Sequence, residues 1–266
     1  MTTLKSLVYR VLYLIALLPF PRRARCTVLL YHSISDTDDF FAVSPSTFAA
    51  QIEQIRKRAD IVPLDAVLRY QAGERFPRDI VALSFDDGYR DFAETAVPVL
   101  RAAEAPATVF VMGGEVDRGE LANGHPLMSA DDIRRIMDSL IAVGSHAMTH
   151  RKLPRLARAE AEKEIAGSRD AIERVTGAAP RFLAYPKGSW NPEVAMLARE
   201  AGYEAAFTVA NRSVRRSDDP YAIPRIQVDS STTPLAFRAK LTSAADWYQS
   251  LWSAGQRMRR LVRVVQ

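Results

Sequence analysis

The sequence has little of several features that would point to a particular class of protein. It holds a single cysteine, Cys26, which excludes an intramolecular disulfide but does not decide the compartment. It shows no internal repeat, no low-complexity tract and no recognisable nucleic-acid module, so we expect no nucleic-acid partner despite the net charge of +5. It also lacks an apolar run of about 20 residues, the length that a helix needs to cross a bilayer.

What is present is the composition of one large catalytic domain. Hydrophobic residues make up 48% and charged residues 25%, which excludes a disordered chain and allows a sizeable core. The 266 residues exceed the usual domain size, yet α/β barrels of this length are commonly one unit. Apolar strand candidates alternate with amphipathic patterns, which favours parallel βαβ units.

The expected elements follow from these patterns. The predicted strands are 27–31, 80–85, 107–112, 140–144, 181–185, 205–209 and 223–228, and the predicted helices are 46–58, 92–103, 130–139, 159–176 and 192–201. Ser46 and Ser129 have the character of N-caps, and Gly177 and Gly202 are expected to end helices.

Two adjacent carboxylates end the second apolar run. Residues 81–85 read Val-Ala-Leu-Ser-Phe, and Asp86, Asp87 and Gly88 follow. Such a run is typical of a buried parallel strand, whose carboxyl end is where barrel enzymes place catalytic residues. Neighbouring side chains on a strand point to opposite faces, so both aspartates can share a pocket only if the backbone turns, which Gly88 permits. Alone, the triplet is also typical of a solvated turn.

A histidine pair supplies the second element. His146 and His150 stand four positions apart, a spacing that on a helical turn brings the Cβ atoms to about 5–6 Å. One aspartate and two histidines provide three metal ligands and leave coordination positions for water and substrate. Alone, such a pair is also typical of structural or exposed histidines.

A third element, Phe-Leu-Ala-Tyr-Pro-Lys-Gly at residues 182–188, completes the pattern. In this order the three elements resemble the polysaccharide deacetylase family, carbohydrate esterase family 4 with its NodB-like domain. The resemblance runs from about residue 27 to residue 228. It implies an α/β fold, a distorted (β/α)7-type barrel.

The resemblance also assigns roles. It makes Asp86 the general base, and Asp87, His146 and His150 the ligands of a divalent cation, for which zinc is expected. The residue before the proline of the third motif offers its backbone N–H to the oxyanion, which points to Tyr185.

Two departures from the family pattern concern side chains near the base. The third motif usually carries an arginine that orients the base, and here that position is Ala184. The second motif usually has Ser or Thr after its first histidine, and here Ala147 stands there. Arg225, on the last predicted strand, is our candidate to contact Asp86 and keep it ionised, the alternative being a surface arginine.

A third departure concerns the general acid. The Leu-x-His motif that usually supplies it near the C-terminus is missing, because no histidine follows His150. The run 27–34 reads Thr-Val-Leu-Leu-Tyr-His-Ser-Ile and resembles the Tyr-His-x-Ile signature of the permuted branch, in which this histidine is the acid. The resemblance therefore gives the role to His32; a strand-end histidine bonded to a carbonyl is the alternative.

The two ends differ from the middle, and we divide the chain into residues 1–25, a catalytic domain at 26–245 and residues 246–266. The first segment has a ten-residue apolar stretch, 11–20, between basic clusters, with no small-residue cleavage site. The last combines Trp247 with arginines, as in interfacial amphipathic segments. We expect a cytoplasmic enzyme, peripheral at an anionic inner-membrane surface; an exported, membrane-anchored enzyme and two helices packed on the barrel are the alternatives.

Together these features predict metal-dependent hydrolysis of an N-acetyl group on an amino sugar in a polysaccharide, oligosaccharide or lipid-linked glycan precursor. A deformylase, an O-deacetylase and an inactive glycan-binding protein are the alternatives that stay open. A glycosidase would need its carboxylates at least about 5 Å apart across a sugar, which adjacent residues do not suit. A non-haem iron oxygenase would gain nothing from the second aspartate.

Overall fold

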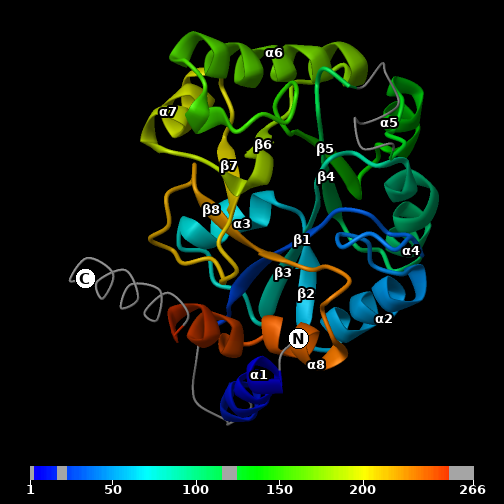
Figure 1. The fold of residues 1–266 in the computed structure, drawn as a ribbon, viewed down its shortest axis with the longest axis vertical. Helices are drawn as coiled ribbons and strands as arrows, with labels where there is room; N and C mark the ends of the chain where they lie inside the picture. Colours follow the sequence, from blue (N-terminus) through cyan, green and yellow to red (C-terminus); the bar gives the residue numbers. More distant parts are fainter. Residues whose placement is uncertain (1–2, 17–22, 116–124, 252–266) are drawn as a thin grey trace.

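The computed structural model describes residues 3–16, 23–115 and 125–251, and its centre is a closed parallel barrel (Figure 1). Seven strands close in the order β1-β8-β7-β6-β5-β4-β3, because β1 pairs with both β8 and β3. Their bounds are β1 Cys26–Tyr31, β3 Asp79–Phe85, β4 Ala107–Val111, β5 Ile141–Ser145, β6 Phe182–Ala184, β7 Ala205–Val209 and β8 Ile223–Gln227. The predicted seven-stranded α/β barrel is confirmed.

An eighth strand, β2, was not predicted from the sequence. It spans Ala59–Val62 and pairs with the first half of β3, while β4 pairs with the second half of β3. Its short sequence, Ala-Asp-Ile-Val, is only partly buried and carries too weak a pattern to stand out.

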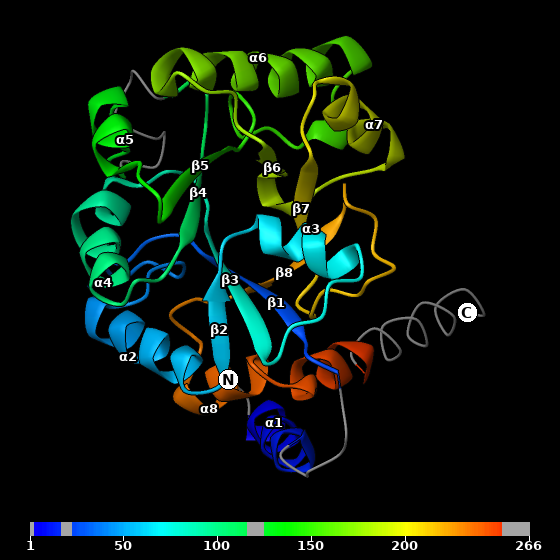
Figure 2. The same ribbon diagram turned by 180° about the vertical axis from the view of Figure 1, so that it is seen from behind.

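Helices surround the barrel. Their bounds are α1 Thr3–Ala16, α2 Pro45–Arg56, α3 Asp65–Gln71, α4 Val97–Ala102, α5 Ala130–Ile136, α6 Arg158–Thr176, α7 Pro192–Glu200 and α8 Pro234–Lys240. A π-helical turn, Phe92–Ala96, leads into α4, and single 3-10 turns lie at Leu153–Arg155 and Pro186–Gly188. Figures 1 and 2 show α6 and α7 at one end of the view and α1 and α8 at the other.

Three of the four predicted helix boundaries are confirmed. Ser129 caps α5 in a capping box with Asp132, and Gly177 and Gly202 follow α6 and α7 with φ of 77° and 85°. The N-cap of α2 is Ser44 instead of Ser46, because Pro45 takes the first helical position and the Ser44 hydroxyl accepts from the Thr47 N–H.

Strand alternation separates two apolar layers. Val28 and Ala82 point into the barrel with Phe110 and Phe207, and α3 packs Val67 against the amino-terminal ends of β1 and β3. The outward-facing residues of the same strands pack under the surrounding helices. The barrel interior is therefore filled by side chains at its amino-terminal end and becomes polar only toward the carboxyl ends of the strands.

The terminal helices belong to the same folded body. Tyr13 of α1 is buried with Ala239 and Ala244, and the chain is helical again over residues 243–251. Residues 17–22 and 252–266 of the predicted terminal segments lie outside the described residues. Within the described ranges, no helix has the length and apolar character needed to span a membrane.

Phe207 offers a test of this core. Its ring lies 5.8 Å from that of Phe110 and 5.9 Å from that of Phe182, all inside the barrel. We expect Phe207→Ala to lower the free energy of unfolding by about 3–5 kcal/mol, because it leaves a cavity that the closed barrel cannot fill. Denaturant unfolding measures this, with Met196→Ala at an exposed position of α7 as a control expected within about 0.5 kcal/mol of the parent. Equal losses in the two variants would contradict the packing argument.

Candidate metal centre and active site

The aspartate pair stands where β3 leaves the barrel. The Asp86 N–H still donates to the Tyr31 carbonyl at 3.0 Å, but Asp87 and Gly88 then adopt φ of 70° and 73°. The left-handed turn brings both carboxylates to the same end of the barrel, and both are buried. A Cβ on residue 88 would meet the Val111 side chain at 3.0 Å, so glycine suits both the turn and the space.

The histidine pair lies on a tight turn after β5, and the expected helical turn is wrong. Ala147 and His150 have φ of 61° and 58°, so residues 146–150 fold back without forming a helix. The two imidazole rings still meet, with centroids 5.0 Å apart. Left-handed backbone at non-glycine residues is held by its surroundings and is concentrated at functional sites.

A buried glutamate holds this turn, and the sequence reasoning missed it. Glu164 of α6 is 7% exposed, and its carboxylate accepts from the N–H groups of Met148 and Thr149 at 3.1 and 2.9 Å and from the Thr149 hydroxyl at 2.5 Å. In the sequence it is one of several acidic residues in an amphipathic helix. Only its position on the buried face sets it apart.

Asp87, His146 and His150 form a cluster that fits a divalent metal. One ligand atom from each lies within 4.8 Å of the others, and Asp87 Oδ1 is 3.4 Å from Nε2 of both histidines. Two ligands at 2.0–2.1 Å from a tetrahedral metal stand about 3.4 Å apart. Asp87 Oδ1 is buried and makes no hydrogen bond within the described residues, as expected of an atom reserved for a cation.

The outer contacts of the cluster orient it for metal binding. His146 Nδ1 lies 2.7 Å from the Ala184 carbonyl, which makes Nδ1 the donor and leaves the Nε2 lone pair facing the cluster. Burial alone would raise the pKa of Asp87, but its contacts with His146 lower it well below the usual range. Burial, then His146, lowers the pKa of His150 to about 4, so this ring is neutral and able to bind a metal at neutral pH.

Arg225 and Asp86 lie together inside the barrel. Arg225 is fully buried, and its Nη1 and Nη2 contact Asp86 Oδ1 and Oδ2 at 2.6 and 2.7 Å. The guanidinium also donates to Ser84 Oγ at 3.4 Å and to the Thr208 carbonyl at 3.3 Å. Burial by itself would raise the pKa of Asp86, but the charge and hydrogen bonds of Arg225, together with the charges of His146 and His32, lower that pKa.

His32 follows β1 and is adjacent to the aspartate pair. The pairing of Tyr31 with Phe85 continues into the contact of the Asp86 N–H with the Tyr31 carbonyl, so residues 32 and 86 are neighbours. The His32 ring packs on Phe41, with centroids 4.6 Å apart. Burial lowers the pKa of His32, and the carboxylates of Asp86 and Asp87 oppose that shift.

Tyr185 does not fit the expected oxyanion role. Its N–H donates to the Phe207 carbonyl at 3.0 Å and so continues the ladder between β6 and β7. The side chain is buried, and its hydroxyl donates to the Tyr221 carbonyl. The ladder bond, which the sequence does not reveal, makes this N–H unavailable. Pro186 has no N–H, so the next one in the motif belongs to Lys187, which holds a left-handed φ of 58°.

Comparison with known proteins agrees with this geometry. The family model described as polysaccharide deacetylase matches residues 73–206, which include the aspartate pair, the histidine pair and the third motif. Among curated proteins, YxkH of Bacillus subtilis, assigned to the polysaccharide deacetylases, is 26% identical over 83% of this chain and 77% of its own. The poly-beta-1,6-N-acetyl-D-glucosamine N-deacetylase of Staphylococcus aureus is 25% identical over 71% of this chain and 68% of its own.

Solved structures resemble the whole barrel. IcaB from Ammonifex degensii is 25% identical, with a TM-score of 0.73 over 82% of this chain and 98% of that one. The Streptococcus pyogenes deacetylase PplD shares the fold at 19% identity, with a TM-score of 0.74 over 83% of this chain and 99% of that one. The closed seven-stranded barrel, the Asp-His-His cluster at its mouth and the family match lead to one conclusion: the chain belongs to the polysaccharide deacetylase family, hydrolases that use a divalent metal to deacetylate carbohydrates.

Proposed function

We propose that this enzyme hydrolyses the N-acetyl group of an amino sugar within a glycan, releasing acetate and a free amine, with zinc as its metal. One observation carries the proposal. Asp86 is kept ionised by Arg225 directly beside the Asp87, His146 and His150 cluster, so a base and three ligands share one mouth.

The residues divide the reaction among them. A zinc ion held by the cluster would polarise the acyl oxygen and lower the pKa of the attacking water. Asp86 accepts the proton as water attacks the carbonyl, which requires it to be ionised. His32, on the neighbouring strand, protonates the leaving amine, which is too poor a leaving group without a proton. We assign the oxyanion contact to the Lys187 N–H in place of Tyr185.

The substrate class follows from the relatives. The Staphylococcus aureus relative is named for poly-beta-1,6-N-acetyl-D-glucosamine, which makes a beta-1,6-linked N-acetylglucosamine oligomer the first substrate to try. A panel with N-formyl and O-acetyl analogues and lipid-linked precursors separates deacetylation from deformylation and O-deacetylation. We expect acetate release and new amine groups that need added metal. Binding without turnover across the panel would favour an inactive glycan-binding protein.

We also propose that the enzyme is peripheral at an anionic membrane surface on the cytoplasmic side, with an exported, anchored form as the alternative. The exposed apolar residues of α1 support peripheral contact. Protease added to intact spheroplasts tests the side. Digestion of the catalytic domain would overturn the cytoplasmic placement.

The metal ligands can be tested one at a time. We expect Asp87→Ala, His146→Ala and His150→Ala each to lose zinc retention and activity together, because three ligands leave none to spare. Elemental analysis of purified variants measures this, with His125→Ala as the control histidine. Full occupancy in His150→Ala would show that the ligand set is wrong.

Asp86 should behave differently from the ligands. Asp86→Asn is expected to keep zinc while kcat falls by at least about 10²-fold, because the amide cannot accept the proton. Metal content and turnover measured on the same preparation separate the two effects. Near-normal turnover would place the base elsewhere.

Arg225 gives a pH prediction whose sign is fixed by the geometry. Arg225 lowers the pKa of Asp86, and burial opposes it, so Arg225→Gln should raise that pKa. The base would then be protonated over a wider acidic range, and the acidic limb of kcat/KM should move to higher pH. The pH profile of the variant, checked for retained fold by circular dichroism, measures the shift. An unmoved acidic limb in a folded variant would contradict the role.

A further inference from the structure

A second concave site lies at the end of the barrel opposite the catalytic mouth. A pocket of about 640 Å3 is bordered by Arg25, directly before β1, and by Tyr70 of α3, which packs at the amino-terminal ends of the strands. The catalytic groups stand at the carboxyl ends. The two sites are therefore separated by the apolar filling of the barrel.

The pocket is cationic. Its lining contains Arg23, Arg25, Arg215 and Arg216 and one carboxylate, Asp246, which leaves a formal charge of +3.

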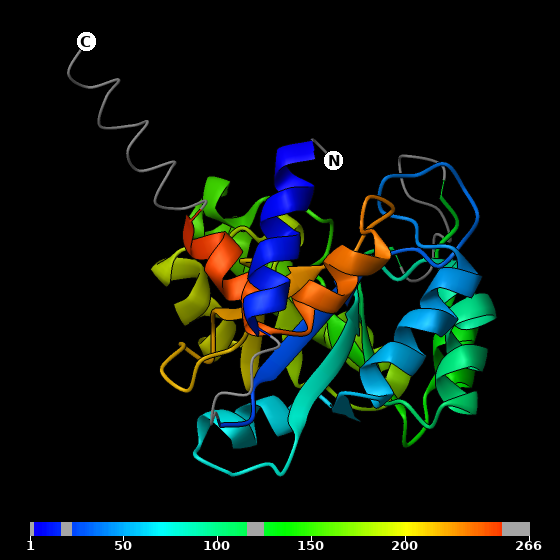
Figure 3. The ribbon, with the colours of Figure 1, turned by 90° about the horizontal axis from the view of Figure 1, so that it is seen from below.

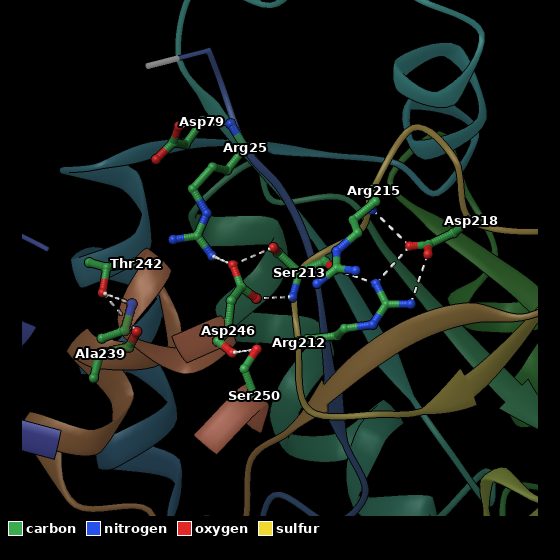
Figure 4. A network of polar contacts seen from close by, with 11 residues as sticks. Arg25, Asp79, Arg212, Ser213, Arg215, Asp218, Ala239, Thr242, Asp246 and Ser250 are labelled. Carbon is green, nitrogen blue, oxygen red and sulfur yellow. Dashed lines mark hydrogen bonds and ion pairs between the residues drawn. The ribbon is translucent and has the colours of Figure 1, made fainter. Parts of the chain in front are cut away.

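The carboxylate of Asp246 already has hydrogen-bond partners within the protein. Its carboxylate lies 2.9 Å from Arg25 Nη2 and accepts from the Ser213 N–H and hydroxyl, each at 2.7 Å (Figure 4). It therefore ties residues 243–251 to the start of β1 and does not neutralise the other three arginines.

Two of the remaining arginines differ in how firmly they are held. Arg216 stacks on Tyr70, 4.7 Å from the ring centroid, and donates to the Glu74 carbonyl at 2.8 Å, so its charge is positioned without a carboxylate partner among these contacts. Arg215 is exposed, and its backbone N–H, not its side chain, contacts Asp218. An anion entering the pocket thus meets one fixed guanidinium and one that can turn toward it.

Apolar groups complete the other wall of the pocket. Ile15 and Ala16 of α1 and Trp247 line it directly. Beyond them, Val11 and Leu14 of α1 are 49% and 64% exposed. Figure 3 shows α1 crossing α8 on the flank of the barrel, with its N-terminus pointing away from the side that carries α3, in agreement with the burial of Tyr13 against α8. An exposed apolar helix therefore borders a cationic pocket.

We propose that this pocket binds the phosphate of an anionic phospholipid headgroup while the exposed side of α1 and Trp247 enter the lipid interface. The arginines can donate charge-assisted hydrogen bonds to a phosphate, and the adjoining apolar side chains can contact the acyl chains next to a headgroup. A soluble anion would contact the arginines but would leave the apolar wall without a partner.

Co-sedimentation of the full chain with vesicles tests the proposal and needs no substrate, so it does not depend on the deacetylase activity. The vesicles are phosphatidylcholine alone or phosphatidylcholine with about one-third phosphatidylglycerol. We expect at least about tenfold tighter binding to the anionic vesicles, weakening as sodium chloride is raised. Equal binding to both vesicles, or no binding, would overturn the proposal.

Charge reversal locates the site. Arg23→Glu with Arg215→Glu should weaken binding to anionic vesicles by at least about 30-fold, because two interfacial cations become anions. The matched control, Lys163→Glu with Arg174→Glu on exposed positions of α6, makes the same change in net charge away from the pocket and should bind nearly as the parent. Equal losses would show a general charge effect and refute the pocket. If the double variant does not fold, Arg215→Gln should give a smaller loss in the same direction.

The apolar part has its own control. Leu14→Asp on α1 should weaken the binding that persists at high salt, whereas Met196→Asp on α7, also exposed, should not. Calorimetric titration with inorganic phosphate and sedimentation velocity cover the other occupants. Phosphate binding without vesicle binding would show that the occupant is a free anion and not a lipid. A dimer that Leu14→Asp dissociates, again without vesicle binding, would show that the occupant is a second copy of the chain.

Discussion

The bidentate contact between Arg225 and Asp86 is the interaction on which the catalytic end depends. Both groups are buried, and removing one partner of such a pair costs about 3–5 kcal/mol because the other charge is left without compensation. The pair joins β8 to β3 across the barrel interior, above the aromatic layer that contains Phe110. It therefore fixes the orientation of the base at the same time as its ionisation, which in the usual family pattern is the task of an arginine in the third motif.

The role of Arg225 could be predicted because the sequence lacks the arginine that the third motif usually carries. Ala184 stands where the motif arginine is expected, and a buried base needs a cation, so a basic residue on a barrel strand was the natural place to look. Position 184 keeps a use in the site, since its carbonyl orients His146. The positive charge that the motif arginine usually supplies therefore comes from Arg225, while residue 184 contributes only its backbone carbonyl, the acceptor for His146.

The barrel could be predicted because its strands are continuous apolar runs. The metal cluster could be predicted because an aspartate pair, a histidine pair and the third motif rarely occur together for another reason. The predictions that were wrong depend on backbone geometry. The spacing of His146 and His150 suits a helical turn, but Glu164 captures the N–H groups of the turn and stabilises a left-handed path. The Tyr185 N–H looked available until its ladder bond to Phe207 was visible. Both outcomes depend on residues distant in sequence, and β2 carried too short a pattern to be recognised.

The amino-terminal end of the barrel carries the cationic pocket and the carboxyl end carries the catalytic groups, and β1 connects the two. Asp246 holds residues 243–251 to Arg25 at the start of β1, and the other end of β1 supplies the Tyr31 carbonyl that receives the Asp86 N–H. Lipid docking at the first end would set the direction in which the second end opens. Strand β1 therefore connects the proposed lipid pocket directly to the catalytic mouth, so the two ends hold one fixed orientation relative to each other.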